Sequence, residues 1–323
     1  MRSFLITIII LVATSISEAR QEPTHLVHGL FDNSDQTHVF YGSLDLDIPQ
    51  FNIFNSLSIN DVGDPSKGKY PVTPFTYDPN NDVAYMAAPN NQNRTILSVI
   101  NATSGALLSN FSSIPNTIVS LQYDIFQKQL FAHTETDSEN VTQVVEIDTA
   151  SGNVKQILGA IRGAKPTHIS SYCPICRKYF LIVLQDQDFV YLAVNTSDGG
   201  GISWEAVMNF TPVSMRFDYK TFTMYTAYIN HTDDISSLVG IINRTLGGIS
   251  KVVGTISDDP SLVVTSLSAY DVAENIYYAS DVLSWPYSAG VSYVNVNTSQ
   301  GKWIPLARDR YNSHAWFVKQ FVH

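Results

Sequence analysis

The chain has 323 residues, of which 44% are hydrophobic and 15% are charged, and its formal net charge is −10 at pH 7. This length and composition are sufficient for one large domain with a substantial apolar core. The acidic balance and the lack of any basic block argue against nucleic acid and anionic membrane surfaces as partners.

The first 19 residues have the composition of a secretory signal peptide. A basic start precedes an apolar run over residues 4–12, and the small residues Ser17 and Ala19 precede a cleavage point. The alternative is a membrane anchor, but a spanning helix needs about 20 apolar residues. The sequence therefore predicts a signal peptide at residues 1–19, a mature domain at residues 20–323 without a membrane span, and an extracellular location.

Three runs typical of β-strands come next, at residues 25–31, 38–46 and 51–59. From residue 70 on, the sequence then repeats a pair of aromatic residues eight positions apart. In four of the five pairs Asp follows the first aromatic, and its carboxylate can hydrogen-bond the backbone of a turn between two strands. The pairs are Tyr77 and Tyr85, Tyr123 and Phe131, Tyr172 and Phe180, Phe217 and Tyr225, and Tyr270 and Tyr278, with Asp at Asp78, Asp124, Asp218 and Asp271.

Each unit also carries an Asn or Asp with Gly four positions later, which predicts a second turn in constant register. Gly readily adopts the positive φ of such a turn, and β-branched residues before it are typical of a strand. Each unit therefore predicts four strands, A to D, joined by an A–B turn, a variable B–C loop and a C–D turn. The pairs are Asn101 and Gly105, Asp148 and Gly152, Asn195 and Gly199, Asn243 and Gly247, and Asn297 and Gly301.

The glycines of successive units lie 47 to 54 residues apart, a spacing close to that of propeller blades. With these turns and strands, residues 70–306 resemble the repeats of YVTN-like and WD40-like β-propellers. The resemblance implies an all-β propeller and is nearly silent on function. A β-sandwich with fortuitous spacing is the alternative.

The two ends of the chain complete the predicted ring. Trp316 lies 46 residues after Tyr270, where another strand A is due. One blade would then join the three N-terminal strands to one C-terminal strand, and this pairing removes free sheet edges. The prediction is a single propeller of six four-stranded blades, with seven blades as the alternative.

Nine N-x-[ST] triplets lie behind the predicted signal peptide, where the chain would meet the machinery that reads them. We expect most of them to carry N-linked glycans. The acceptors are Asn93, Asn101, Asn110, Asn140, Asn195, Asn209, Asn230, Asn243 and Asn297.

The two cysteines, Cys173 and Cys176, form a C-x-x-C motif at an A–B turn, where other units carry Asp. A redox centre of this type relies on a helix N-terminus that lowers a thiol pKa, and a four-ligand zinc site would need a second such motif. We therefore expect a structural disulfide across the turn.

Two acidic groups fall in predicted B–C loops and are candidate ligand-binding residues: Asp186 with Asp188, and Asp233 with Asp234. Their oxygens could hold calcium, but neither group has EF-hand spacing. Solvated acidic turns are the commoner origin of such groups. No metal or other cofactor is therefore predicted, with calcium as the alternative.

The B–C connection of the fifth unit contains Trp285 and Tyr287, two large aromatics in a segment expected to face solvent. Such residues often anchor a sugar or a peptide. The alternative is that they fold back over the blade as local core.

No nucleophile elbow, phosphate-binding loop or H-E-x-x-H motif is present. The first hypothesis is therefore a secreted, non-enzymatic binding protein whose D–A and B–C loops engage an extracellular protein or glycan. The alternatives are a lactonase-like hydrolase with a divalent ion in the central channel, and a structural matrix or coat glycoprotein. The residues before the strand A aromatics disfavour the hydrolase because they include no carboxylate: Thr76, Gln122, Ser171, Arg216 and Ala269.

Overall fold

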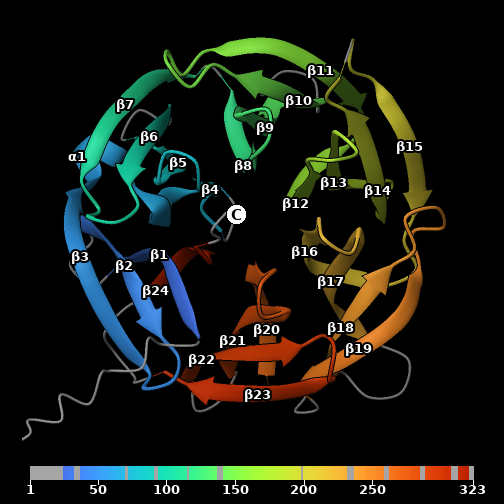
Figure 1. Ribbon diagram of the computed structural model, residues 1–323. Helices are drawn as coiled ribbons and strands as arrows, with labels where there is room; N and C mark the ends of the chain where they lie inside the picture. The colour runs from blue at the N-terminus through green and yellow to red at the C-terminus, as the bar shows by residue number, and fades with distance from the viewer. Residues whose placement is uncertain are drawn as a thin grey trace, which may run out of the picture.

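Six four-stranded antiparallel sheets surround a central axis in the computed structural model (Figure 1). The described residues are 25–32, 37–69, 72–90, 94–114, 116–136, 141–197, 199–230, 236–257, 262–283, 288–306 and 312–319. The chain is a six-bladed β-propeller, as predicted, and the seven-bladed and sandwich alternatives are wrong.

The blades are numbered in chain order, and the first strand given for each is the innermost. Blade 1 contains β24 (Asn312–Phe317), β1 (Leu26–Asp32), β2 (His38–Asp45) and β3 (Gln50–Ser58). Blade 2 contains β4 (Phe75–Asp78), β5 (Val83–Pro89), β6 (Thr95–Asn101) and β7 (Leu107–Ile114). Blade 3 contains β8 (Thr117–Asp124), β9 (Gln129–Thr136), β10 (Val141–Ile147) and β11 (Val154–Arg162).

Blade 4 contains β12 (Lys165–Cys173), β13 (Lys178–Gln185), β14 (Asp188–Asn195) and β15 (Ile202–Val207). Blade 5 contains β16 (Thr211–Asp218), β17 (Thr223–Asn230), β18 (Ser236–Ile242) and β19 (Ile249–Ser257). Blade 6 contains β20 (Leu262–Asp271), β21 (Ile276–Leu283), β22 (Ser288–Asn295) and β23 (Gln300–Pro305). A short helix, α1 (Ile59–Val62), and a 3₁₀ turn, η1 (Pro65–Lys67), connect blades 1 and 2.

Blade 1 closes the ring as the sequence predicts. The C-terminal strand β24 pairs antiparallel with β1, with Trp316 opposite Gly29, and the two strands lie side by side in Figure 1. Beyond β24, the Lys319 ammonium lies 3.1 Å from the Asp82 carboxylate of blade 2. The closure therefore combines a backbone ladder within blade 1 with an ion pair to its neighbour.

The core lies between the blades. The described residues form six buried apolar clusters, one for each pair of neighbouring blades. One cluster joins Leu97 of blade 2 to Leu121 of blade 3, and another joins Phe31 of blade 1 to Tyr278 of blade 6. Because every sheet is covered on both faces, its middle strands, such as β5 and β6, are buried on both sides, whereas outer strands such as β15 and β23 are largely exposed.

The A–B turns form because the Asp of each Tyr-Asp or Phe-Asp pair caps the backbone. The Asp124 Oδ1 atom accepts hydrogen bonds from the backbone N–H groups of Phe126 and Gln127, at 2.8 and 3.0 Å. Asp78, Asp218 and Asp271 cap the corresponding turns in the same way. The predicted role of this Asp is confirmed.

The C–D turns follow the predicted register in blades 2, 3 and 5 and depart from it in blade 6. In blade 2, for example, the N–H of Gly105 donates to the Asn101 carbonyl, and Gly105 has φ +71°. In blade 6 the corresponding hydrogen bond runs from Ser299 to Asn295, and Gly301 lies within β23. The prediction for blade 6 was therefore two residues too late.

The reason is that Asn295 begins this turn. Its Oδ1 accepts hydrogen bonds from the N–H groups of Asn297 and Thr298, each at 3.1 Å. Ser299 then adopts the positive φ, at +60°, that Gly adopts in the other blades. Asn297 consequently lies inside the turn and not at its first position.

Two of the buried turn carboxylates also link their blade to the next. Asp124 is fully buried, and its Oδ2 accepts a 2.7 Å hydrogen bond from the hydroxyl of Tyr172 on the inner strand of blade 4. Tyr270 of blade 6 makes the same contact, at 3.3 Å, with Asp218 of blade 5. We call this contact the Asp–Tyr clip.

Blade 4 is the exception, because its A–B turn is closed by a disulfide. Cys173 and Cys176 are bonded to each other, as predicted, with their Cα atoms 5.5 Å apart. Cys173 takes the place of the capping Asp, and the next blade presents Phe217 in place of Tyr. At this junction blade 4 therefore lacks the carboxylate acceptor, and blade 5 lacks the hydroxyl that would donate to it.

Tyr172→Phe tests the Asp–Tyr clip. The change removes the donor to a buried carboxylate, so we expect the free energy of unfolding to fall by about 1–3 kcal/mol. Tyr219→Phe is the matched control, because the Tyr219 hydroxyl makes no hydrogen bond with the described residues. This control should change the free energy of unfolding by less than about 0.5 kcal/mol. Urea unfolding of both variants measures the difference. Equal losses would contradict a linking role for the clip.

Candidate functional site

Only one of the predicted acidic groups lies within the described residues. Asp186 and Asp188 are exposed at the tip of the hairpin between β13 and β14, where Asp186 and Gln187 both have positive φ. Asp233, Asp234, Trp285 and Tyr287 lie outside the described residues, in B–C loops. Ligand binding by these loops therefore stays a prediction.

The seven described glycosylation acceptors are accessible to different degrees, and none is buried. Asn93 and Asn140 lie outside the described residues. Because strands alternate in direction, the C–D turns share one end of the ring with the A–B turns, and we call this end the turn face. Asn110, Asn209 and Asn297 are exposed, whereas Asn101, Asn195, Asn230 and Asn243 are partly exposed.

The five residues that precede the strand A aromatics come together at the centre of the turn face. They line a recess of about 180 Å³ at the mouth of the central channel. All six blades contribute to this recess, including blade 1 through Phe317 and Val318. The members that the sequence had aligned are Thr76, Gln122, Ser171, Arg216 and Ala269.

A smaller recess of about 40 Å³ lies farther along the channel. Its lining includes His168, Ser170 and Ser214, and it shares Gln122 and Arg216 with the mouth recess. Gln122 and Arg216 therefore lie where the two recesses meet. A ligand group that passes from the mouth into the inner recess would meet these two side chains.

Arg216 is the cation of this channel. Its Nε donates to the Ser268 carbonyl at 3.2 Å, its Nη2 donates to the same carbonyl, and its Nη1 donates to the Met215 carbonyl at 3.2 Å. Among the described residues, no carboxylate forms an ion pair with it. Burial lowers the pKa of Arg216, because the charged guanidinium is removed from water.

A hydrogen-bonded chain fixes the opposite channel wall, between blades 3 and 4. His133 Nε2 lies 2.6 Å from the Thr167 carbonyl, so this nitrogen donates, and the neutral ring accepts at Nδ1 from the Tyr179 hydroxyl, 3.0 Å away. The Tyr179 oxygen lies 3.1 Å from Ser170 Oγ. Since the Tyr179 hydroxyl donates its only hydrogen to His133 Nδ1, the Ser170 hydroxyl must be the donor in its contact with Tyr179.

Gln122 completes this wall. Its Nε2 donates to the backbone carbonyl and to Oγ of Ser170, at 3.2 and 3.1 Å, and Ser120 Oγ lies 2.7 Å from the same Oγ. The amide orientation of Gln122 is therefore determined by Ser170. Its Oε1 atom makes no hydrogen bond with the described residues, and the Gln122 side chain lines both recesses.

Two histidines near the channel are held neutral. Burial lowers the pKa of His133 and of His168 to about 4, and the Arg216 charge contributes to the shift of His168. The backbone of Val213 accepts a hydrogen bond from one ring nitrogen of His168, while Nε2 is buried without a partner. His168 Nε2 is thus an unused acceptor near the cation.

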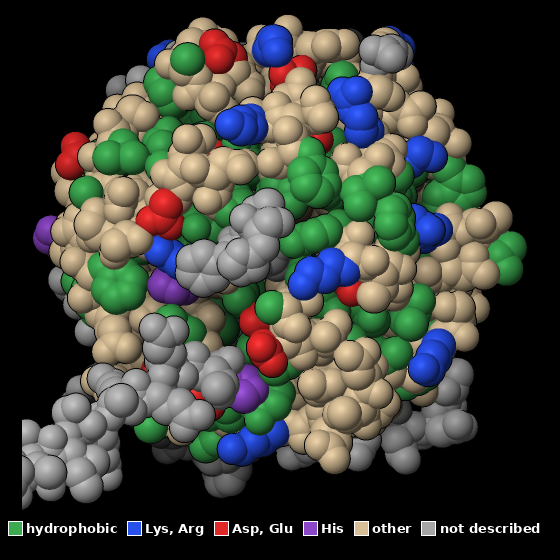
Figure 2. All heavy atoms as spheres, viewed as in Figure 1, with side chains coloured by type: hydrophobic (Ala, Val, Ile, Leu, Met, Phe, Trp, Pro, Cys, Tyr) green, Lys and Arg blue, Asp and Glu red, His purple; other side chains and the backbone are tan. Residues whose placement is uncertain are grey.

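The turn face around the mouth is apolar. Phe126, Ile175 and Phe222 follow the inner strands of blades 3, 4 and 5, and their side chains are 48%, 48% and 43% exposed. The rings of Phe126 and Tyr219 meet edge to face, 6.4 Å apart. Figure 2 shows hydrophobic side chains gathered beside the centre of the ring, over β8 and β12.

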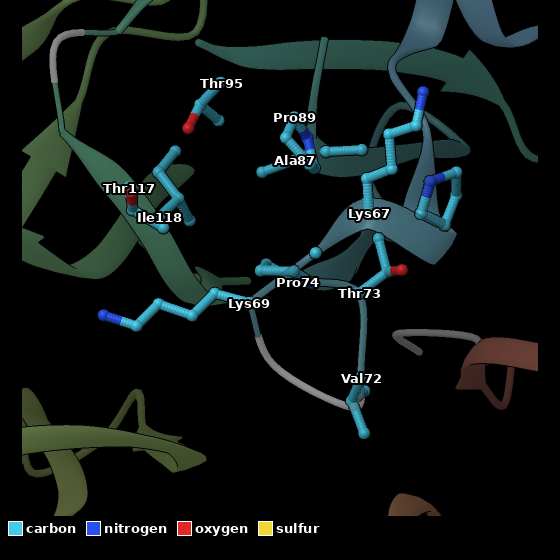
Figure 3. Close-up of a pocket in the computed structure, with 13 residues that line it drawn as sticks. Lys67, Lys69, Val72, Thr73, Pro74, Ala87, Pro89, Thr95, Thr117 and Ile118 are labelled. Atoms are coloured by element: carbon cyan, nitrogen blue, oxygen red, sulfur yellow. The ribbon is translucent and has the colours of Figure 1, made fainter. Parts of the chain in front are cut away.

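A third recess, of about 270 Å³, opens beside η1 between blades 2 and 3 (Figure 3). Its lining includes Lys67 and Lys69, whose side chains extend in opposite directions. Lys67 pairs with Asp64 at 3.3 Å, and Lys69 pairs with Glu135 at 2.6 Å. These cations already have acidic partners, unlike Arg216.

The channel residues do not fit a divalent cation. Such an ion takes several oxygen ligands, usually with carboxylates among them, whereas the aligned positions supply two hydroxyls, one amide, one methyl and the Arg216 guanidinium. The guanidinium charge would repel the ion. The described residues contain no group of three or more His, Cys, Asp or Glu side chains placed to hold a metal.

Sequence reasoning missed the chemical role of Arg216 and His168. Arg216 was noted only as a position without a carboxylate, and His168 was not singled out. The available signal was the repeat itself, since Arg216 is the one charged residue at the position before the strand A aromatic. His168 carries no comparable sequence signal, because its place beside Arg216 depends on the packing of blade 4 against blade 5.

No protein-family model matches the chain, and no curated protein matches its sequence. TolB from Acinetobacter baumannii has a similar structure, with 10% identity over 92% of this chain and 67% of that chain and a TM-score of 0.61. A chain of a nidogen/laminin complex has 10% identity over 91% of this chain and 99% of that chain, with a TM-score of 0.57.

A putative 6-phosphogluconolactonase from Bacteroides uniformis has 12% identity over 87% of this chain and 82% of that chain, with a TM-score of 0.54. At these identities the likenesses show the fold alone, a β-propeller. The fold fits both a binding protein and a lactonase-like enzyme. Among the described residues, no helix is long and apolar enough to cross a membrane.

The buried histidines predict a loss of stability in mild acid. His28, His133 and His168 have pKa values lowered from 6.5 to about 4 by burial, so the folded chain binds fewer protons than the unfolded chain between these pH values. Stability is therefore complete above pH 6.5 and falls as the pH decreases towards 4, by up to about 3 kcal/mol for each histidine. Urea unfolding between pH 7.5 and 4.5 measures this loss.

His168→Gln should make the pH dependence shallower, because one of the three titrating groups is removed. His38→Gln removes an exposed imidazole and should keep the loss seen in the unmodified protein. A stability that does not change over this pH range would contradict the prediction.

Proposed function

We propose that the protein is a secreted, N-glycosylated, non-enzymatic binding protein that takes part of an extracellular protein or glycan ligand into the mouth of its central channel. The observation that carries this proposal is the mouth recess, to which all six blades contribute. Its polar residues are held by hydrogen bonds between inner strands, as for Gln122 and Ser170. A site on rigid elements binds without a large ordering cost.

The surroundings of the mouth support binding to a large ligand. The exposed apolar side chains of Phe126, Ile175 and Phe222 offer a surface that a partner can cover. One structure of similar fold is named as a complex of nidogen with laminin, so propellers of this general shape serve in protein binding. The lactonase-like alternative loses support because the channel residues do not fit a divalent ion.

Secretion and glycosylation are tested together. Expression in cells with a secretory pathway should release a protein that lacks residues 1–19 and loses mass on enzymatic removal of N-linked glycans. Asn297→Gln should reduce the mass by one glycan, because Asn297 is exposed in its turn. An unglycosylated protein that stays in the cytosol would contradict the proposal.

Thr76→Trp tests the mouth as the binding site. Thr76 is partly exposed in the recess, so an indole there should fill space that the ligand requires and weaken binding about tenfold or more. Lys251→Trp adds the same side chain at an exposed position of the outer strand β19 and should leave binding unchanged. Arrays of extracellular glycans and purified extracellular proteins provide the measurement.

Equal binding by both variants would place the ligand away from the mouth. Hydrolysis of a lactone by the unmodified protein, with loss of that activity after chelation of divalent ions, would replace the proposal by the enzymatic alternative.

A further inference from the structure

Arg216 has hydrogen-bonding capacity that the described residues leave unused. A guanidinium carries five N–H donors, and the contacts to the Ser268 and Met215 carbonyls use three of them. Both acceptors are neutral carbonyl groups. Two donors of a cation are therefore available at the point where the two channel recesses meet.

The charge of Arg216 is also uncompensated. The ammonium groups of Lys67, Lys69, Lys155 and Lys319 each lie within 3.3 Å of a carboxylate, whereas Arg216 forms no ion pair in the described part of the chain. A cation that is largely removed from water without a counter-ion is unfavourable. An oxyanion in the channel would supply the missing charge, and a carboxylate can accept two parallel hydrogen bonds from a guanidinium.

A second unused group lies on the neighbouring blade. His168 lines the inner recess together with Arg216, and its Nε2 is buried without a partner. The ring is neutral and its other nitrogen is bonded to the Val213 backbone, so Nε2 presents a lone pair. Such an atom needs a donor, and Gln122 Oε1 offers a further acceptor at the same junction.

Arg216 needs an anionic acceptor and His168 Nε2 needs a hydrogen-bond donor, and the two needs together restrict the chemistry of the ligand. A simple anion would satisfy Arg216 but would face the lone pairs of His168 and Gln122. A neutral alcohol would satisfy those acceptors but would leave the Arg216 charge without a partner. A carboxylate with a nearby hydroxyl group satisfies both, because it brings one anionic acceptor and one donor.

We propose that the central channel binds a hydroxy acid group, with the carboxylate on Arg216 and a neighbouring hydroxyl donating to His168 Nε2 or Gln122 Oε1. Acidic sugars carry this combination, so the inference gives a chemical class to the ligand of the proposed binding protein and rests on that proposal. No bond is made or broken, since the group is bound and released unchanged.

Matched small molecules test the inference in the unmodified protein. Lactate and propionate differ only in one hydroxyl, and D-glucuronate and D-glucose differ in the carboxylate. We expect lactate to bind more tightly than propionate, by a factor of about five or more for one hydrogen bond. Glucuronate should bind at least about tenfold more tightly than glucose, because its carboxylate makes a charge-assisted contact. Isothermal titration calorimetry and the rise in melting temperature measure both pairs.

Variants then assign the effect to the named residues. Arg216→Gln should weaken lactate and glucuronate binding by about 10- to 100-fold, while Arg216→Lys should retain part of it. Lys220→Gln removes an exposed positive charge from the adjacent A–B turn and is the matched control, which should bind as the unmodified protein does. His168→Phe should reduce the preference for lactate over propionate, because it removes one of the two acceptors for the hydroxyl.

The stability of the free variant separates a binding role from a structural one. Arg216→Gln should melt close to the unmodified protein without ligand, since it removes an uncompensated charge. Equal binding of lactate and propionate, equal binding of glucuronate and glucose, or undiminished binding by Arg216→Gln would each overturn the inference. If the small acids fail while Thr76→Trp still abolishes binding of a larger ligand, the inference fails and the proposed function stands. If the small acids bind and no larger ligand depends on the mouth, the proposed function fails and the hydroxy acid site stands.

Discussion

The Asp–Tyr clip fixes the position of one blade relative to the next, between blades 3 and 4 and between blades 5 and 6. A carboxylate such as Asp124, with no exposed surface and no recorded cation partner, is stable in the core only when several donors point at it. Two backbone N–H groups of its own turn and the Tyr172 hydroxyl of the next blade supply them. The turn conformation is thereby coupled to the position of the neighbouring blade. Blade 4 supports this reasoning, because the loss of the acceptor at Cys173 coincides with the loss of the donor at Phe217.

The same coupling brings polar side chains to the channel in defined positions. The residue before each strand A aromatic projects to the opposite side of the inner strand from that aromatic, because successive side chains of a strand point to opposite faces. Residues separated by about 50 positions in sequence therefore converge on one recess. Hydrogen bonds between inner strands, such as those from Gln122 to Ser170, hold this wall in place. A site of this kind has little conformational freedom to lose when a ligand arrives.

Electrostatics distinguishes this site from the recess beside η1. The chain is acidic overall, and the lysines beside the recess near η1 have acidic partners. Arg216 has only carbonyl oxygens, in a region where charge interactions are weakly screened. The glycosylation acceptors of the C–D turns lie at the outer part of the same face, whereas the apolar side chains of Phe126, Ile175 and Phe222 surround its centre. A ligand would therefore meet an apolar surface with one cationic recess at its middle.

The sequence by itself determined the blade number, the composite first blade, the turn carboxylates and the disulfide, because these follow from local patterns that recur in each unit. It also aligned the five channel-facing positions, since strand periodicity and the Tyr-Asp register suffice for that. The turn of blade 6 was misplaced, because only Asn297 has a Gly four positions later, whereas the turn begins at Asn295 and Ser299 adopts the positive φ. The lack of a counter-ion for Arg216 and of a hydrogen-bond partner for His168 Nε2, among the described residues, was decided by the tertiary structure alone. Whether a cation has a counter-ion, or an imidazole nitrogen has a partner, depends on which side chains from other blades come within hydrogen-bonding distance, and no local pattern contains that information.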